Sequence, residues 1–175
     1  MDELGRKTPE LFRESKKFPL ILVLDNVRSM MNIGSVFRTA DAFLLEGIYL
    51  CGITATPPHR EIHKTALGAT ESVMWKYFQD TSEAVSLLKQ EGYHVWALEQ
   101  TSNSIDLALF QPKIDQQYAL VFGNEVKGVD EKVLEVCDGC IEIPQFGTKH
   151  SLNISVTAGM VIWDFYSKIK EIMMD

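Results

Sequence analysis

The sequence predicts an α/β domain in which a sheet rich in parallel strands is flanked by helices. Three observations support this prediction. Strand-like and helix-like patterns alternate along the 175 residues, which favours repeated βαβ units. The run at residues 20–24 is wholly apolar, as is typical of a strand that is buried on both faces. Polar turns follow three of the apolar runs, and the carboxyl ends of parallel strands meet at one edge of a sheet.

The first predicted unit begins with the strand at residues 20–24. Apolar residues then recur at helical spacing between Ile33 and Leu44. Gly47 separates this helix from a second strand at residues 48–51. A strand, a helix and a strand in this order predict a βαβ unit.

The rest of the chain continues the alternation without a linker, a repeat or a low-complexity stretch. We therefore expect one domain over residues 1–175, of which residues 1–19 are a short N-terminal extension. The further predicted elements are a short helix at 59–64, a strand at 72–78, a helix at 80–92, strands at 93–98 and 118–122, a helix at 130–136, a strand at 140–143 and a helix at 153–173.

The predicted last helix is apolar on more than one side. A helix that packs only against its own domain needs a single apolar stripe. The second stripe therefore predicts either a surface that covers a partner subunit or a helix that is buried deeply in its own domain. The first stripe contains Ile154, Ala158, Phe165 and Ile169, and the second contains Val156, Met160, Trp163 and Tyr166.

Composition and charge limit the function. No apolar run reaches the ~18 residues that a membrane span needs, and the first residues lack a signal-peptide core, so we expect a cytoplasmic protein without membrane contact. The formal net charge of -7 is unusual for a nucleic-acid binder. A basic surface on an acidic body is nevertheless compatible with the cations in or near the polar turns, which are Arg28, Arg38, Arg60, Lys64, Lys127 and Lys149.

The three cysteines, Cys51, Cys137 and Cys140, are too few for a disulfide framework. Cys137 and Cys140 form a Cys-x-x-Cys pair, but it precedes a predicted strand and not the start of a helix, as a redox pair prefers. A structural zinc site would need two more ligands, for which His59 and His63 are candidates. Because no spacing brings the two pairs together, we expect free thiols and no metal.

The three polar turns, at residues 25–38, 122–128 and 143–153, predict one composite site. The first turn lacks the Gly-x-Gly-x-x-Gly fingerprint, which disfavours a nicotinamide or flavin enzyme of ordinary Rossmann type. Gly123 follows a strand directly, so its backbone can approach a ligand closely. Each turn also has an ordinary explanation, because the sequence allows Ser151 or Asn153 to cap a helix, Glu125 to be solvated and Arg38 to pair with Asp41.

The order of the residues in these turns resembles the three motifs of the SpoU (TrmH) branch of the SPOUT RNA methyltransferases. The resemblance extends from about residue 20 to residue 166, and three ordered motifs are far more specific than any one of them. In this chain the motifs are Asn32-x-Gly34-x-x-x-Arg38, then Phe122-Gly123-Asn124-Glu125-x-x-Gly128, then Ile143-Pro144 with Ser151-Leu152-Asn153-x-Ser155-x-x-x-Gly159.

The resemblance implies a deep trefoil knot in the C-terminal part, S-adenosylmethionine bound in that knot, an obligate homodimer, and methyl transfer to a ribose 2'-hydroxyl of tRNA or rRNA. By matching motifs, it implies active-site roles for Asn32, Arg38, Glu125, Ser151 and Asn153. It also implies that the backbone around Leu98, Gly123, Ile143, Ser151 and Leu152 holds the cofactor.

These residue types suit such a reaction. A sulfonium methyl group is already a strong electrophile, so the enzyme must mainly align the 2'-oxygen and help to remove its proton. The guanidinium of Arg38, with a pKa above ~12, is a poor base, and we expect it to bind the adjacent phosphate and to stabilise the developing alkoxide. We expect Asn32, Ser151 and Asn153 to orient the ribose and Arg38, and Glu125 to hold either the loop or the arginine.

Two other classes of function are considered. One is a non-catalytic RNA-binding dimer on the same fold, against which the intact motif residues argue. The other is a small-molecule redox enzyme that uses Cys137 and Cys140. The chain is also close to a minimal catalytic domain with an acidic balance, which favours a helper protein or a small accessible target such as a tRNA loop.

Overall fold

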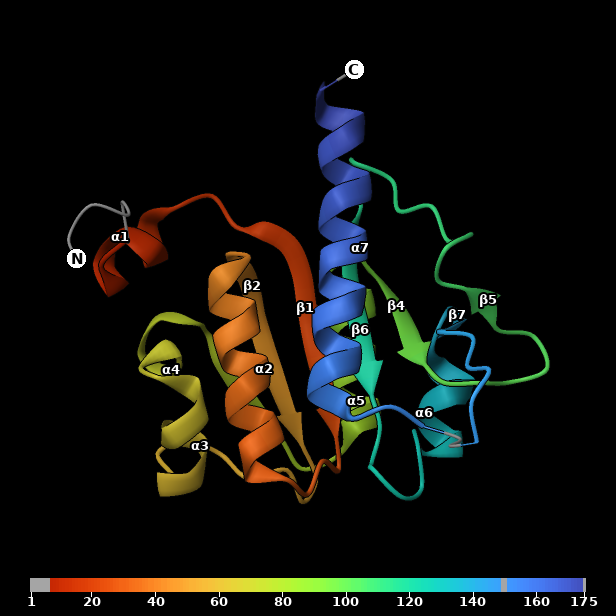
Figure 1. Cartoon of the computed structure of the whole chain (residues 1–175), viewed down its shortest axis with the longest axis horizontal. Coiled ribbons are helices and arrows are strands. Elements are labelled where there is room, and N and C mark those ends of the chain that lie inside the picture. Colours follow the sequence, from red (N-terminus) through yellow and green to blue (C-terminus); the bar gives the residue numbers. More distant parts are fainter. Residues whose placement is uncertain (1–6, 149–150, 175) are drawn as a thin grey trace.

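A computed structural model describes residues 7–148 and 151–174. Its centre is a seven-stranded sheet with the strand order β3-β2-β1-β6-β4-β7-β5, and neighbouring strands are parallel (Figure 1). The strands are β1 (Phe18–Asp25), β2 (Leu45–Cys51), β3 (Trp75–Phe78), β4 (Tyr93–Leu98), β5 (Ile105–Asp106), β6 (Gln117–Phe122) and β7 (Gly139–Glu142).

Helices cover both faces of the sheet. Residues of α2, α3, α4 and α7 share one buried cluster, whereas residues of α5 and α6 belong to the cluster on the other face. Among the described residues, none of the helices combines the length and the apolar character that crossing a membrane requires. The helices are α1 (Pro9–Glu14), α2 (Met30–Ala42), α3 (Arg60–Ala66), α4 (Ala69–Ser72), α5 (Thr81–Gln90), α6 (Glu131–Val136) and α7 (Ile154–Met174).

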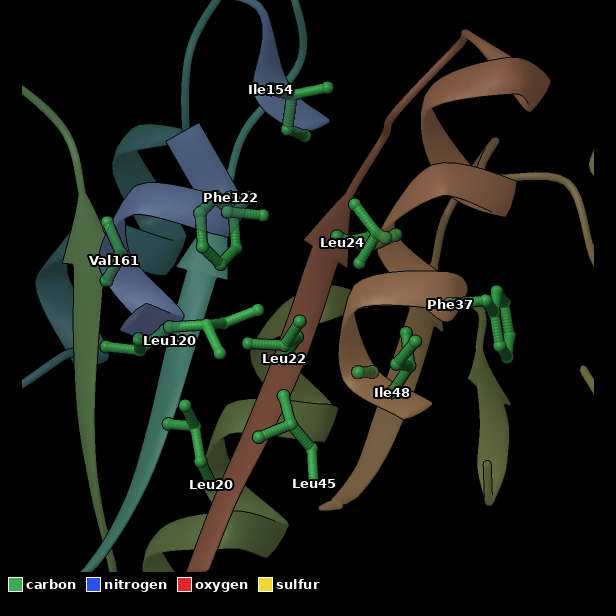
Figure 2. Packing of buried hydrophobic residues seen from close by; sticks show 14 of the residues in the cluster. Leu20, Leu22, Leu24, Phe37, Leu45, Ile48, Leu120, Phe122, Ile154 and Val161 are labelled. Carbon is green, nitrogen blue, oxygen red and sulfur yellow. The ribbon is translucent and has the colours of Figure 1, made fainter. Parts of the chain in front are cut away.

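Strand β1 confirms the prediction of burial on both faces. Leu20, Leu22 and Leu24 point into the cluster beneath α2 and α7, while Ile21 and Val23 point into the opposite cluster. Figure 2 shows the three leucines between side chains of neighbouring strands and of the covering helices. All five side chains are at most 2% exposed, so β1 is the apolar centre of the sheet.

The prediction of one strand over residues 72–78 is wrong in its first part. Residues 69–72 form α4, and the strand begins only at Trp75. Gly68, with φ 91°, ends the turn after α3 and allows a second short helix to start directly behind it. The periodic patterns also missed α1 and the two-residue strand β5.

Helix α7 resolves the alternatives for its second apolar stripe. The first stripe packs into the core, and its members are at most 7% exposed. In the second stripe, Val156, Met160 and Trp163 are 52%, 43% and 59% exposed, respectively. Three of the four members of the second stripe are therefore exposed, whereas Tyr166 is half-buried and packs against Phe18 and Phe43.

The last strand, β7, is inserted between two strands that precede it in the chain. Ala97 of β4 pairs with Cys140, and Ile105 of β5 pairs with Ile141. Residues 99–104 join β4 to β5 at the edge of the sheet where the chain leaves β7. Beyond β5, the Lys168 ammonium on α7 donates hydrogen bonds to the carbonyls of Leu107 and Phe110, which fixes the next segment against α7.

Gly34 lies where helix α2 packs against helix α3. Ser29 caps α2 by accepting a hydrogen bond from the Asn32 N–H, and the buried face of the helix then follows at helical spacing. A Cβ atom at Gly34 would overlap the Thr65 hydroxyl and the Ile62 carbonyl of α3. The glycine therefore allows α2 and α3 to pack closely.

We expect Gly34→Ala to lower the free energy of unfolding by about 1–3 kcal/mol, because α3 would have to move away from α2. Urea denaturation of the variant and the parent measures this change. Ser35→Ala is the control, because the Ser35 hydroxyl bonds only to the Met31 carbonyl of its own helix, and we expect a change within ~0.5 kcal/mol. Equal stability of Gly34→Ala and the parent would contradict the assigned packing.

Candidate functional site

A cavity of about 550 Å³ lies where β4, β6 and β7 end. Its walls come from residues 98–100, residues 122–128 and two stretches between residues 141 and 157. The three strands are neighbours in the sheet, and Leu98 pairs with both Phe122 and Ile141, so their ends lie at the same level. Two of the three polar turns therefore line one cavity.

All the residues for which the sequence predicts cofactor contacts line this cavity. Leu98 ends β4, and Gly123 directly follows β6. Ile143 directly follows β7, while Ser151 and Leu152 precede α7. The structure thus brings these five positions together from three separate parts of the chain.

Glu125 ties the second polar turn to the first. Its carboxylate oxygens accept hydrogen bonds from the backbone N–H groups of Arg28 and Ser29, each at 3.0 Å. Burial raises the pKa of Glu125, but hydrogen bonds from these backbone groups, from its own N–H and from the Asn32 side chain outweigh burial and lower the pKa below 4.5. Of the two roles considered for Glu125, the structure shows that it holds the loop.

Asn153 ties the third polar turn to the first. Its side-chain N–H group donates a hydrogen bond of 3.1 Å to the Oδ1 atom of Asn32. Its own Oδ1 atom accepts hydrogen bonds from the Ser155 N–H and hydroxyl, so it also caps α7. Asn153 therefore both caps α7 and contacts Asn32 within the site. Asn32, Glu125 and Asn153 form one connected group beside Ser151.

Two of the predicted active-site residues, Asn32 and Arg38, do not line the cavity, and of these only Asn32 is bonded to a lining residue, Asn153. Arg38 is exposed on α2. The pairing with Asp41 that the sequence allows does not form, and the Asp41 carboxylate accepts a hydrogen bond from Ser72 of α4. Within residues 7–148 and 151–174, the Arg38 guanidinium makes neither an ion pair nor a side-chain hydrogen bond.

Sequence reasoning missed Asp25, which anchors the first turn. Its carboxylate is only 1% exposed and accepts hydrogen bonds from the Thr81 hydroxyl at 2.6 Å, the Asn26 amide at 2.8 Å and the Asp130 N–H at 3.1 Å. A buried carboxylate is costly unless such donors surround it. The signal in the sequence was a charged residue at the end of a wholly apolar strand.

Asn26 continues this anchor toward Glu125. Its backbone is left-handed, with φ 55°, and its Oδ1 atom accepts a hydrogen bond from the Ile53 N–H. Its carbonyl accepts a hydrogen bond of 2.8 Å from the side chain of Asn124. The tight turn after β1 is thereby fixed directly to the turn that carries Glu125.

Glu99 holds the other end of the second turn. Its Oε2 atom accepts a hydrogen bond of 3.0 Å from the Val129 N–H. Gly128 has φ 73°, and a Cβ atom there would overlap this carboxylate. A Cβ atom at Gly123 would overlap the backbone of Gly128 and Val129, so both glycines are required for the narrow turn.

Cys137 and Cys140 are free thiols, and both are half-buried. Burial raises the pKa of Cys137 to about 12, so little thiolate is available for disulfide exchange at neutral pH. Within the described part of the chain, no cluster of three or more metal-binding side chains occurs. Of the cations that the sequence places near the turns, Lys149 lies outside the described residues.

Comparison with known proteins gives consistent results. A protein-family model described as the SpoU rRNA Methylase family matches residues 19–163. The 23S rRNA (guanosine-2'-O-)-methyltransferase RlmB of Neisseria meningitidis is 34% identical over 144 residues, which are 82% of this chain and 56% of that protein. The chain thus spans little more than half the length of this curated relative.

Solved structures show the same fold. The TrmH/SpoU tRNA modifying enzyme of A. aeolicus superposes with a TM-score of 0.81 at 24% identity, over 95% of this chain and 82% of that one. The AdoMet-bound rRNA methyltransferase of Sinorhizobium meliloti superposes with a TM-score of 0.79 at 25% identity, over 93% of this chain and 61% of that one.

We expect Glu125→Gln to reduce the dependence of stability on acid pH. The folded-state pKa of Glu125 lies below 4.5, so its ionised form stabilises the fold above that pH, and this contribution is lost as the pH falls through the lowered value. The melting temperature of the parent should therefore fall more steeply than that of Glu125→Gln below about pH 4.5.

Thermal melts at a series of pH values measure the two slopes. Glu135→Gln, at an exposed position on α6, is the control and should keep the slope of the parent. Identical slopes for Glu125→Gln and the parent would show that the carboxylate does not hold the turn.

Proposed function

Because the chain belongs to the SpoU rRNA methylase family, we propose that it transfers a methyl group from S-adenosylmethionine to a ribose 2'-hydroxyl of tRNA or rRNA. The observation that carries this proposal is that the second and third polar turns line one cavity while Glu125 and Asn153 of these turns bond to residues of the first. Asn32 and Asn153, which bond to each other, are 121 residues apart in the sequence. We also propose that the protein acts in the cytoplasm, where such RNA is made or used.

The cavity fits the proposed cofactor. Its volume lies within the ~300–1,000 Å³ of sites that enclose ligands of this size. The backbone of residues 123–128 forms one wall, and its glycines bring main-chain N–H and C=O groups to the surface. The walls also offer apolar contacts from Leu98, Ile143 and Leu152 and carboxylates from Glu99 and Glu142, which suit a ligand with an aromatic base and positive charge.

When bound, S-adenosylmethionine supplies an electrophilic methyl group. The residues of this chain then have to place the ribose oxygen in line with that group and to assist the loss of its proton. Asn32 and Asn153, joined by their hydrogen bond, and the nearby Ser151 orient the ribose. The ionised Glu125 keeps the first turn, and with it the start of α2, in place beside the cavity.

Arg38 acts on the RNA and not on the cofactor. Its side chain is exposed and lies outside the cavity, on the same helix as Asn32. A guanidinium at this position binds a phosphate of the RNA next to the reacting ribose, and its charge stabilises the developing alkoxide.

The exposed stripe of α7 supports a homodimer. Val156, Met160 and Trp163 present apolar area to solvent, and Trp163 packs edge-on against Phe43, which ends α2. An exposed apolar patch of this kind is typical of an interface. We propose that a second copy of the chain covers this face.

A trefoil knot is also consistent with the strand order. The chain leaves β7 between β4 and β5, whose connection at residues 99–104 lies at the same edge. We propose that the segment that follows β7, residues 143–148, passes through the loop formed by residues 99–116. The cavity then lies where the threaded segment meets the ends of β4 and β6.

The proposed reaction is tested by transfer of labelled methyl groups from S-adenosylmethionine to unmodified total tRNA and, separately, to rRNA. Nuclease mapping of the product should place the label in a 2'-O-methylated nucleotide. If neither RNA is labelled while cofactor binding is intact, the chain is a binding module of the same fold or requires a further protein.

We expect Arg38→Ala to lose methyl transfer by at least a hundredfold while it binds S-adenosylmethionine as the parent does, because Arg38 lies outside the cavity. Arg38→Lys should recover part of the rate, since it keeps the charge but not the two-pronged geometry. Transfer assays and calorimetric titration of the cofactor measure both effects. Comparable turnover in Arg38→Ala would remove Arg38 from the chemistry.

We expect Trp163→Glu to weaken the dimer, because the buried charge would have no partner in the interface. Light scattering should show monomer or aggregate, and cofactor binding should be reduced or lost. Lys170→Glu, at an exposed position farther along α7, is the control. A stable and active monomer in Trp163→Glu would refute the proposed interface.

A further inference from the structure

A second cavity, of about 540 Å³, lies on the other side of α2 from α7. Its walls are apolar and come from Pro57, Pro58, Ile62 and Trp75. Figure 1 shows α3 and α4 beside α2 on this side, near the edge at which β1 and β2 end. None of the three family motifs contributes to this cavity.

The rim of this cavity is less acidic than the protein as a whole. Among its ten lining residues, Arg60 and Lys64 are cations, and Glu71 is the one acidic residue. The whole chain, in contrast, has 24 acidic and 17 basic residues. A local excess of cations on an acidic protein is complementary to a polyanion.

The cations of this rim are accessible. Arg60 and Lys64 are exposed, and Arg60 forms no ion pair within the described residues. Lys64 pairs with Glu61, but their side chains are 51% and 39% exposed. Such surface pairs contribute little free energy, so a phosphate can compete for the lysine.

The cavity lies close to the proposed reaction site. The Thr65 hydroxyl of α3 donates a hydrogen bond of 3.0 Å to the carbonyl of Met31, the residue before Asn32. Asn32 in turn contacts Asn153 at the first cavity. Helix α3, which lines the second cavity, therefore packs directly against the helix that carries Asn32, and the axes of such packed helices lie about 8–10 Å apart.

We propose that the second cavity binds an unpaired nucleotide of the RNA substrate, close in sequence to the nucleotide that is methylated. Its base packs against Trp75 and the prolines, and its phosphates lie at Arg60 and Lys64. The Glu71 carboxylate and the Thr70 hydroxyl offer acceptors for N–H groups on the edge of the base. This inference rests on the proposed function, because it assigns part of the substrate of the same reaction.

The test measures binding of a labelled single-stranded RNA of mixed sequence, and of unmodified tRNA, to the full chain by fluorescence anisotropy. Arg60→Ala with Lys64→Ala should weaken binding by about tenfold and reduce the slope of log affinity against log salt concentration by about 1.4. The KM for RNA should rise with little change in kcat, and the affinity for S-adenosylmethionine should not change. The matched control is Lys16→Ala with Lys170→Ala, which removes two exposed cations that do not line this cavity.

The aromatic wall is tested separately. Trp75→Leu should weaken RNA binding by about tenfold, because stacking of a base is lost, whereas Trp75→Phe should restore most of it. Melting temperature and cofactor binding check that both variants are folded. An anionic peptide of acidic residues serves as a competitor and should not displace the RNA.

Two outcomes would overturn the inference. Equal losses in the Arg60/Lys64 and Lys16/Lys170 double variants would show that binding depends on charge alone. Displacement of the RNA by the acidic peptide at similar concentration would assign the cavity to a protein partner. Failure of the proposed function is distinguishable, because the parent would then transfer no methyl group to either RNA, whereas failure of this inference leaves transfer intact with an unchanged KM in the Arg60/Lys64 variant.

Discussion

The site depends on the two hydrogen bonds that the Glu125 carboxylate accepts from the backbone N–H groups of Arg28 and Ser29. They join turns that are 97 and 96 residues apart in the sequence and that follow the neighbouring strands β1 and β6. The start of α2, with Asn32 and the attached Asn153, has its position because this pair of bonds fixes the turn before it. The lowered pKa of Glu125 keeps the carboxylate ionised, and therefore a strong acceptor, throughout the neutral range.

The same arrangement recurs around the edge of the sheet. Asp25 accepts a hydrogen bond from the Asp130 N–H, and Glu99 accepts one from the Val129 N–H. In each case a carboxylate at the end of a strand binds main-chain N–H groups of another segment and not an arginine or a lysine. The acidic residues thus stabilise the turns, while cations such as Arg38 and Arg60 stay free to meet phosphate. This division reconciles the net charge of -7 with the proposed action on RNA.

Much of the fold could be predicted from local patterns, and the errors have physical causes. The wholly apolar run of β1 and the polar turns at strand ends indicated a parallel sheet with a site at one edge. The first part of the strand predicted at residues 72–78 was wrong, because Gly68 permits a short helix that no periodic pattern reveals. The two-residue strand β5 is too short to have a pattern, and the insertion of β7 beside it is a choice between distant segments.

For the candidate site, too, local sequence patterns predicted some of the residues but not their contacts with distant parts of the chain. Motif order brought Glu125 and Asn153 to attention, but their contacts with Ser29 and Asn32 appear only in three dimensions. Asp25 and Glu99 look like ordinary charged residues in the sequence, and only the fold shows which backbone groups they hold. Asp41 was the local partner available to Arg38, yet Ser72, 31 residues away, takes its place.

The insertion of β7 has a consequence for the synthesis of the protein. The cavity walls include residues 141–143 and 151–154, which the ribosome delivers after every other strand of the sheet. A nascent chain can form β1, β2, β4 and β6 and still have no enclosed site, because the third wall has not yet been made. The binding of a ligand enclosed by all the walls of this cavity therefore reports that the segment up to residue 157 has been made and has reached its place.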